Sequence, residues 1–465
     1  MLYATAAAIF AALVFFIWVA LRDRTPVASL DDYLTARGSQ NSTALGLSFL
    51  ASGMGAWILF VPPEIGAFVG PVALVGYALS AALPFLLLAW LGPAIRQQMP
   101  QGRTIAEFAQ ERFGQGLRLW VSALSVLYML CFITAELTAI GAITGLLSEL
   151  PGSVVIVAVA VTTLVYTTWG GLRASMVTDR WQAWLLLALL AIVIGVTLFS
   201  LPQNAVTQAW PAAPIEVSLN VALTLLIAVT AANIFHQGYW QRVWSARSDT
   251  ELRKGALLGG ALTVPVMLAM GALGMLCMAM GKNPGSPPIP FFALLSDAPA
   301  WLALPVLVLA VALVASSVDT LQSGIASLVV TARPQVSLGA ARWITVLLML
   351  PVVWVSLQGL SVLRLFLIAD LLCATAVVPV LLGLWQRMTP TAAVAGAVAG
   401  LLGAVLPGWV SGGSFSAGLL AASFPTSVPT LAPFAGALLA STGVSLLLVW
   451  LKPQAHKRLA SNRPT

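Results

Sequence analysis

The chain has 465 residues, of which 60% are hydrophobic and only 8% are charged, and its mean hydropathy is +0.96. Soluble domains carry about 25% charged residues, so this composition excludes an ordinary soluble protein and predicts one that folds in a lipid bilayer. The net charge of +7 does not indicate a nucleic-acid partner, because the basic residues are scattered at the ends of apolar segments and form no cluster.

Thirteen apolar segments have the roughly 20 residues that a helix needs to cross about 30 Å of hydrocarbon. They lie near 3–21, 42–69, 71–98, 120–147, 153–170, 179–201, 217–241, 255–281, 296–331, 340–360, 362–386, 390–408 and 430–451. The first lacks the basic start and the small-residue cleavage site of a signal peptide, and Arg22 and Arg24 follow it, so we expect a retained helix. The sequence therefore predicts an all-α integral membrane protein, a single domain over 1–465 with about 13 transmembrane helices.

The basic residues predict the orientation of these helices. With the N-terminus outside and the C-terminus in the cytoplasm, 20 of the 22 lysines and arginines fall on the inner side. Only Lys282 and Arg364 remain outside, and Arg242 is counted among the inner residues. The main polar interlude, 101–116, reads as an amphipathic cytoplasmic helix that begins with a capping box of Thr104 and Glu107. Its simplest interpretation is a solvated linker helix with no role in the function.

Two segments carry residues that interrupt a helix at membrane depth. The second segment contains Gly53, Gly55, Pro62 and Pro63, and the seventh contains Asn233, His236, Gln237 and Gly238. Interrupted helices in corresponding positions of two halves indicate a transporter site built from an inverted repeat. Freed backbone carbonyls at such breaks can bind a cation, although membrane glycines also serve close helix packing.

The ninth segment places four oxygen-bearing side chains within five residues: Ser316, Ser317, Asp319 and Thr320. Hard cations prefer oxygen ligands, so this run is a candidate Na⁺ site. A serine in a membrane helix can instead bond back to its own helix or bridge to another one. Asp319 has no such simple alternative, because a carboxylate at this depth needs a cation, a partner or a proton.

The segment 166–182, YTTWGGLRASMVTDRWQ, places a lone acid, Asp179, at a membrane boundary. Its tyrosine, Gly-Gly pair, alanine and Thr-Asp-x-x-Gln run resemble the signature of the sodium:solute symporters. This resemblance covers most of the chain and implies a LeuT-like core of two inverted five-helix repeats, 42–201 and 217–386. One extra helix at 3–21 would precede the core, and two helices within 390–451 would follow it.

The resemblance also implies ion sites. ASGMGAW is similar to the first-helix motif of the proline-type branch, which implies a sodium site formed by the carbonyls of Ala51, Met54 and Leu313 and the hydroxyls of Ser316 and Ser317. A possible second sodium site would use Asp179, Ser316, Asp319 and Thr320. The alternative role for Asp179 is to organise an inner gate with Arg173 or Arg180.

The candidate substrate residues lie around the two breaks and in the remaining membrane acids. They are Gly55, Trp57, Glu64, Glu136, His236, Gln237 and Asp370. Only Arg364, near an outer end, is left to pair with the three acids inside the membrane, so the acids either are protonated or await a cationic ligand. The run HQGYWQ resembles the urea and polyamine branch of the family, whereas Gly53 and Gly55 depart from the proline transporters. For His236 the alternative is an interhelical hydrogen bond.

Together these patterns predict a sodium-coupled secondary active symporter that imports a small polar nitrogenous solute (an amino acid, urea or another amine) by alternating access. We expect Na⁺, the solute and lipid as its partners, no nucleic acid, a bacterial inner membrane as its location, and a monomer that suffices for transport. The alternatives are a proton-coupled symporter, a channel or a transport-like sensor, although few residues follow the last segment. A membrane-embedded enzyme is the least favoured class, because no Ser/His/Asp set, metal-ligand spacing or nucleotide motif is present.

Overall fold

A computed structural model describes residues 2–22, 29–201, 206–286, 288–296, 298–332, 336–359, 362–426 and 428–451. The longer helices are α1 (Leu2–Arg22), α3 (Ser42–Gly53), α5 (Pro71–Gln98), α7 (Gln115–Leu147), α8 (Gly152–Phe199), α9 (Ile215–Ile234), α11 (Asp249–Ala279), α13 (Ala303–Thr331), α14 (Leu338–Ser356), α15 (Val362–Ala374), α17 (Pro390–Gly412) and α19 (Leu431–Leu451). Shorter helices are α2 (Leu30–Thr35), α4 (Val61–Phe68), α6 (Ile105–Phe113), α10 (Gln237–Ser245), α12 (Pro290–Leu295), α16 (Val377–Leu381) and α18 (Phe415–Ala422), with 3₁₀ turns η1 (Ala56–Leu59), η2 (Ala300–Leu302) and η3 (Leu382–Leu384). The described ranges contain no β-strand beyond an isolated bridge between Gln40 and Ala246, so the predicted all-α class is confirmed.

The number of membrane spans differs from the prediction. Ten helices in the described part are long and apolar enough to cross a membrane, or 12 if each of two bent pairs counts as one span. The bent pairs are Ser42–Gly53 with Ala56–Phe68, at 62°, and Leu363–Ala374 with Val377–Leu384, at 45°. The predicted count of 13 is not confirmed, because the segments expected at 153–170 and 179–201 both lie within the 48-residue α8.

A kink at Gly171 divides α8. At about 1.5 Å per residue a straight helix of this length would extend about 70 Å, more than twice the hydrocarbon thickness. Gly171 has φ 58° and ψ −150°, a conformation open to glycine, and a side chain there would overlap the carbonyl and ring of Tyr33. The Gly-Gly pair of the signature segment therefore turns the chain at the end of the bundle.

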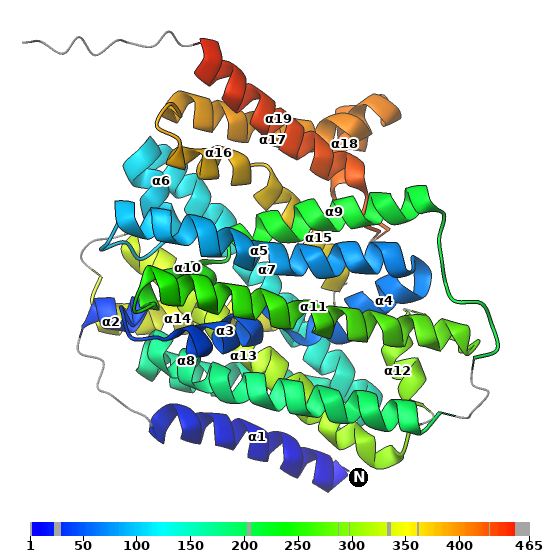
Figure 1. The fold of residues 1–465 in the computed structure, drawn as a ribbon. Coiled ribbons are helices and arrows are strands. Elements are labelled where there is room, and N and C mark those ends of the chain that lie inside the picture. Colours follow the sequence, from blue (N-terminus) through cyan, green and yellow to red (C-terminus); the bar gives the residue numbers. More distant parts are fainter. Residues whose placement is uncertain are drawn as a thin grey trace, which may run out of the picture.

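The helices form one bundle (Figure 1), and most residues of α13 are buried within it. α13 packs against α3, α7, α8 and α14. α1 covers α8 on one side of the bundle, and α17, α18 and α19 lie together on the opposite side (Figure 1). These outer helices expose large apolar side chains, for example Val410 and Trp450, which is the surface expected of a protein surrounded by lipid.

Basic side chains from separate loops meet acids at one end of the bundle. Asp31 accepts hydrogen bonds from Arg37 and Arg103, and Asp32 pairs with Arg173 at 2.8 Å. Partial burial favours the protonated form of Asp31, but the two arginines outweigh it and hold the pKa of Asp31 below its ordinary value. The excess of lysines and arginines that predicts a cytoplasmic side thus corresponds to a compact network of ion pairs at that end of the bundle. We call it the basic network.

The polar interlude folds as predicted into α6. The hydroxyl of Thr104 accepts from the backbone of Glu107, and the Glu107 carboxylate accepts from the backbone of Thr104, so the capping box is confirmed. Its apolar face is not solvated, because Ile105, Phe108 and Phe113 are buried. The helix is therefore packed on the bundle rather than fully solvated, and its lack of a role in transport stays a prediction.

α4 and α11 pack backbone against backbone, and this contact should be sensitive to a single methyl group. A Cβ at Gly274 would overlap the carbonyl of Pro63, so we expect Gly274→Ala to destabilise the protein by about 1–3 kcal/mol. Gly195 in α8 is the matched control, because a Cβ there would meet no atom within 4 Å. Melting temperatures in detergent should fall by several degrees for Gly274→Ala only, and equal behaviour of the two variants would contradict this packing.

Candidate functional site

The first helix break is capped by a buried carboxylate. α3 ends at Gly53, Met54 and Gly55 are extended, and the backbone of Ala56 at the start of η1 donates to the Glu136 carboxylate at 2.6 Å. A side chain at Gly55 would overlap that carboxylate, so only glycine allows this approach. A negative charge at the first free N–H groups of a helix is stabilising. Glu136 and Gly55, both predicted to bind substrate, thus shape the break.

The second break separates α9 from α10 at Phe235 and His236. The ring of His236 is fully buried and stacks on Tyr239 with centroids 4.1 Å apart. Gln237 accepts from the backbone of Ile105 at 3.2 Å and donates to the carbonyl of Arg103 at 2.8 Å. His236 and Gln237 therefore do not line the central cavity described below; Gln237 instead joins the break to the start of α6.

A third break, which the sequence reading missed, separates α15 from α16 at Thr375 and Ala376. Pro379 has no N–H to donate to the carbonyl of Thr375, so the helix cannot continue regularly there. Gly400 in α17 packs so closely on Thr375 that a side chain would overlap its carbonyl. Pro379 was the available signal for this break.

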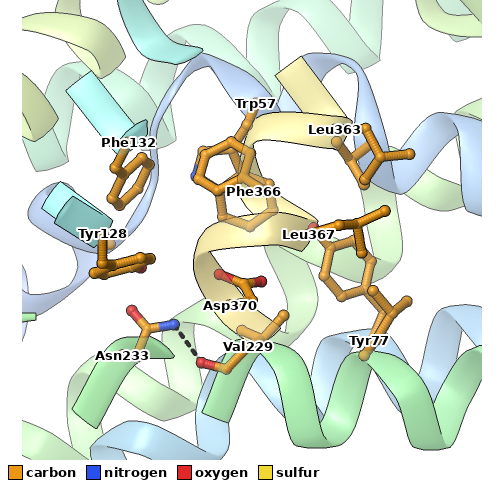
Figure 2. A pocket seen from close by; sticks show the side chains of 13 residues that line it. Trp57, Tyr77, Tyr128, Phe132, Val229, Asn233, Leu363, Phe366, Leu367 and Asp370 are labelled. Carbon is orange, nitrogen blue, oxygen red and sulfur yellow. Dashed lines mark hydrogen bonds between the residues drawn. The ribbon is translucent and has the colours of Figure 1, made fainter. Parts of the chain in front are cut away.

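A cavity lies where the broken α3–η1–α4 segment faces α7, α9 and α15 (Figure 2). Its described lining residues are Gly53, Trp57, Val61, Tyr77, Tyr128, Phe132, Leu225, Val229, Asn233, Leu363, Phe366, Leu367 and Asp370. The free volume is only about 60 Å³, so the walls are close together in this conformation. We call this the central cavity.

Asp370 is the only charged side chain in the described lining of the central cavity. In Figure 2 its carboxyl group lies among the rings of Trp57, Tyr128 and Phe366. It is 6% exposed, and no described residue forms a hydrogen bond or ion pair with it. Aromatic faces and a carboxylate together attract an organic cation, because the ring quadrupole and the charge act in the same direction.

The residues implied for the first sodium site come from two adjacent helices. Ala51 and Met54 lie at the C-terminal end of α3, where the last carbonyls of a helix lack partners in a following turn. Leu313, Ser316 and Ser317 lie on α13, which packs against α3 and η1. The Ser317 hydroxyl is fully buried and has no hydrogen-bond partner among the described residues. An orphaned buried hydroxyl on the helix that packs against α3 and against η1 fits a Na⁺ site.

The residues of the possible second sodium site are also brought together, but an arginine lies among them. Arg242 of α10 is fully buried and pairs with Asp179 of α8 at 2.6 Å. Its guanidinium also donates to Ser48 at 2.7 Å and Thr320 at 3.0 Å. Ser316 donates to the other oxygen of Asp179 at 2.8 Å. We call Asp179, Arg242, Ser48, Ser316 and Thr320 the buried ion-pair cluster.

The ion-pair cluster corrects two expectations. Arg242 was counted as a cytoplasmic flank and lies instead inside the bundle. The proposed gate partners of Asp179 are wrong, since Arg173 pairs with Asp32 and Arg180 is exposed. An Arg five residues after a predicted break was the available signal, because it follows a helix interruption at membrane depth.

The Asp319 carboxylate accepts hydrogen bonds from uncharged side chains. Tyr166 donates to one of its carboxylate oxygens at 2.5 Å and Ser175 to the other at 2.6 Å. Tyr166 and Ser175 belong to the signature segment on α8, so this segment holds α13 through hydroxyl groups. The sequence indicates that Asp319 needs a partner but does not indicate that Tyr166 and Ser175 supply it.

Known proteins resemble this chain in sequence and in fold. The family model of the sodium:solute symporter family matches residues 33–400. The spermidine transporter DUR31 of Candida albicans is 29% identical over 368 residues, which cover 77% of this chain and 70% of the transporter. Because that relative comes from a yeast, the bacterial location stays a prediction.

Solved structures resemble the whole bundle. A Na⁺-coupled sialic acid symporter in a substrate-bound outward-open state aligns with a TM-score of 0.73 at 17% identity, over 95% of this chain and 98% of that one. The nucleobase-cation-symport-1 transporter Mhp1 in a closed conformation aligns with a TM-score of 0.58 at 14% identity, over 91% of this chain and 96% of that one. At these identities the likeness shows the fold alone, and that fold is the predicted LeuT-like one; the boundaries of its two repeats stay a prediction.

Proposed function

Because the chain belongs to the sodium:solute symporter family, we propose that it couples the inward movement of Na⁺ to the uptake of an amine-type organic cation. The family and the apolar helices make the chain an integral membrane symporter. In the proposed orientation the N-terminus lies outside, and Na⁺ and the organic cation move inward together. One copy of the chain contains a whole cavity, which supports a monomer as the transporting unit.

The observation that carries the proposal is Asp370. A carboxylate that is buried among aromatic side chains, and that has no partner among the described residues, is costly unless a cation joins it. An ammonium group with a methylene chain satisfies both features, since the charge meets Asp370 and the chain meets the aromatic walls. A neutral sugar would leave the carboxylate uncompensated.

Two further observations support this choice. The relative from Candida albicans is a spermidine transporter, and spermidine is an amine cation of this kind. The orphaned hydroxyl of Ser317, on the helix that packs against α3, supports sodium as the coupling ion. Substrate roles for Gly55, Glu136, His236 and Gln237 have less support, because these residues contact the protein rather than the cavity.

Asp370→Asn should strongly impair amine uptake while the protein stays folded. Asparagine keeps the shape but removes the charge, and losing a charged partner costs about 1.5–3 kcal/mol, or roughly 10- to 100-fold in KM. Uptake of radiolabelled spermidine into proteoliposomes, with and without an inward Na⁺ gradient, is the measurement. The matched control is Glu216→Gln, an exposed acid at the start of α9.

Several outcomes would contradict the proposal. If wild-type uptake is independent of the Na⁺ gradient but depends on a pH gradient, the coupling ion is the proton rather than Na⁺. Unchanged spermidine uptake by Asp370→Asn would remove Asp370 from the site. Uptake of hexoses with no inhibition by any amine would exclude a cationic solute.

A further inference from the structure

A second and larger cavity lies beside the central one and contains its own acid. It has a volume of about 1020 Å³ and is lined by residues of α4, α7, α8 and α15 and of the proline-rich loop before α12. Glu64 is the only charged side chain in its described lining. The other polar groups are hydroxyls such as those of Ser153 and Ser356. We call this the outer cavity, because it lies at the end opposite the basic network.

The two cavities share a wall. Val61 of α4 and Leu363 of α15 line both of them. Glu64 follows Val61 by one helical turn, and Asp370 follows Leu363 by two turns, which is about 10 Å along α15. The two carboxylates thus belong to neighbouring cavities that meet at the apolar side chains of Val61 and Leu363.

Glu64, like Asp370, has no partner for its carboxylate in the part of the chain that the structure describes. No hydrogen bond or ion pair to its side chain occurs among the described residues. The two basic residues expected at this end are engaged elsewhere: Lys282 donates to Ser296, and Arg364 donates to the carbonyl of Ser423. A cation that reaches the outer cavity therefore meets an acid and no competing base in its described lining.

We infer that Glu64 binds a second ammonium group of the same solute, so that the transporter selects extended polyamines over monoamines. This inference rests on the proposed function, since it needs a first ammonium group at Asp370. A linear polyamine places methylene chains between its charges, and those chains match the apolar wall of Val61 and Leu363. A monoamine can satisfy only one of the two carboxylates, whichever cavity it enters.

The test compares a polyamine with a monoamine of similar chain chemistry. Uptake of radiolabelled spermidine and of radiolabelled butylamine is measured in proteoliposomes under a Na⁺ gradient for the wild type, Glu64→Gln, Asp370→Asn and the control Glu216→Gln. We expect Glu64→Gln to raise the KM for spermidine about tenfold and to leave that for butylamine within about twofold. Glu64→Asp, which keeps the charge, should recover part of the loss, and melting temperatures should show that all variants are folded.

The two proposals fail in different ways. If the wild type transports neither amine, the proposed function fails, and this inference fails with it. If Asp370→Asn loses both amines but Glu64→Gln treats them alike, only the second ammonium site is overturned. An equal loss of both amines in Glu64→Gln would instead assign Glu64 a role in general attraction or in proton exchange.

Discussion

Replacing Arg242 with glutamine is expected to abolish uptake and to lower the melting temperature strongly. The substitution leaves Asp179 buried without its cation, and breaking a buried ion pair from one side costs about 3–5 kcal/mol. The guanidinium also joins α10 to α3 through Ser48 and to α13 through Thr320, so its loss separates three helices. Arg242→Lys should remain impaired, because a lysine ammonium cannot reproduce the planar fork.

A double-mutant cycle tests the pairing itself. Asp179→Asn and Arg242→Gln should each be severe, whereas the double variant should be less destabilised than the sum of the two by about 2–3 kcal/mol. Arg180→Gln is the matched control, since Arg180 adjoins Asp179 in sequence but is exposed. Additive losses would show that Asp179 and Arg242 act separately.

The same pair bears on the number of sodium ions. The guanidinium already supplies a cation to the carboxylate that would otherwise attract a second Na⁺. We therefore expect a Hill coefficient for sodium near one in wild-type protein. A value near two would assign a second ion to this cluster in spite of Arg242.

Replacing Ser317 with alanine is expected to raise the Na⁺ concentration for half-maximal uptake about 10- to 100-fold, as the loss of a ligand to a charged group would. Ser317 is the cleaner target of the two serines, because its hydroxyl has no protein partner to lose. Ser316 donates to Asp179, so its replacement also disturbs the ion-pair cluster. The Ser316→Ala/Ser317→Ala variant should show the larger effect.

Ser327→Ala provides the control for Ser317→Ala. Ser327 is buried on the same helix, and its hydroxyl only bonds back to Gly324 at 2.8 Å. Sodium activation curves of spermidine uptake, measured at constant ionic strength, separate the two variants. An unchanged half-maximal concentration in Ser317→Ala would remove this residue from the sodium site.

The helix breaks were accessible from sequence because their cause is local. The chain leaves helical geometry at Met54 and Gly55, where a side chain in place of glycine would overlap the Glu136 carboxylate. Pro62 and Pro63 lie in the first turn of the next helix, α4, which proline tolerates. The break at Thr375 has an equally local cause in Pro379. It lies in a mostly apolar segment, without a run of polar residues that would mark it. A helix break could therefore be predicted where glycine or polar residues mark it, but not where a single proline lies in an apolar segment.

The partners of the buried charges were not accessible from sequence. Arg242 lies in a run of polar residues after a break, and only the packing of α10 between α3 and α13 shows that it is inside. Glu136 likewise looked like a free membrane acid until its contact with Ala56, 80 positions away, was known. Pairing across helices depends on helix rotation, which a pattern of apolar residues fixes only approximately.

The neutrality of the Asp179–Arg242 pair has an electrical consequence. The two charges cancel and remain with the protein. A membrane potential therefore acts chiefly on the transported ions and on the Asp370 carboxylate of the empty cavity. Each positive charge that enters gains about 2.3 kcal/mol per 100 mV from an inside-negative potential. An ionised Asp370 makes the unloaded carrier negative, and the same potential then favours its return to the outward-facing state. The voltage would thus assist both halves of the proposed cycle.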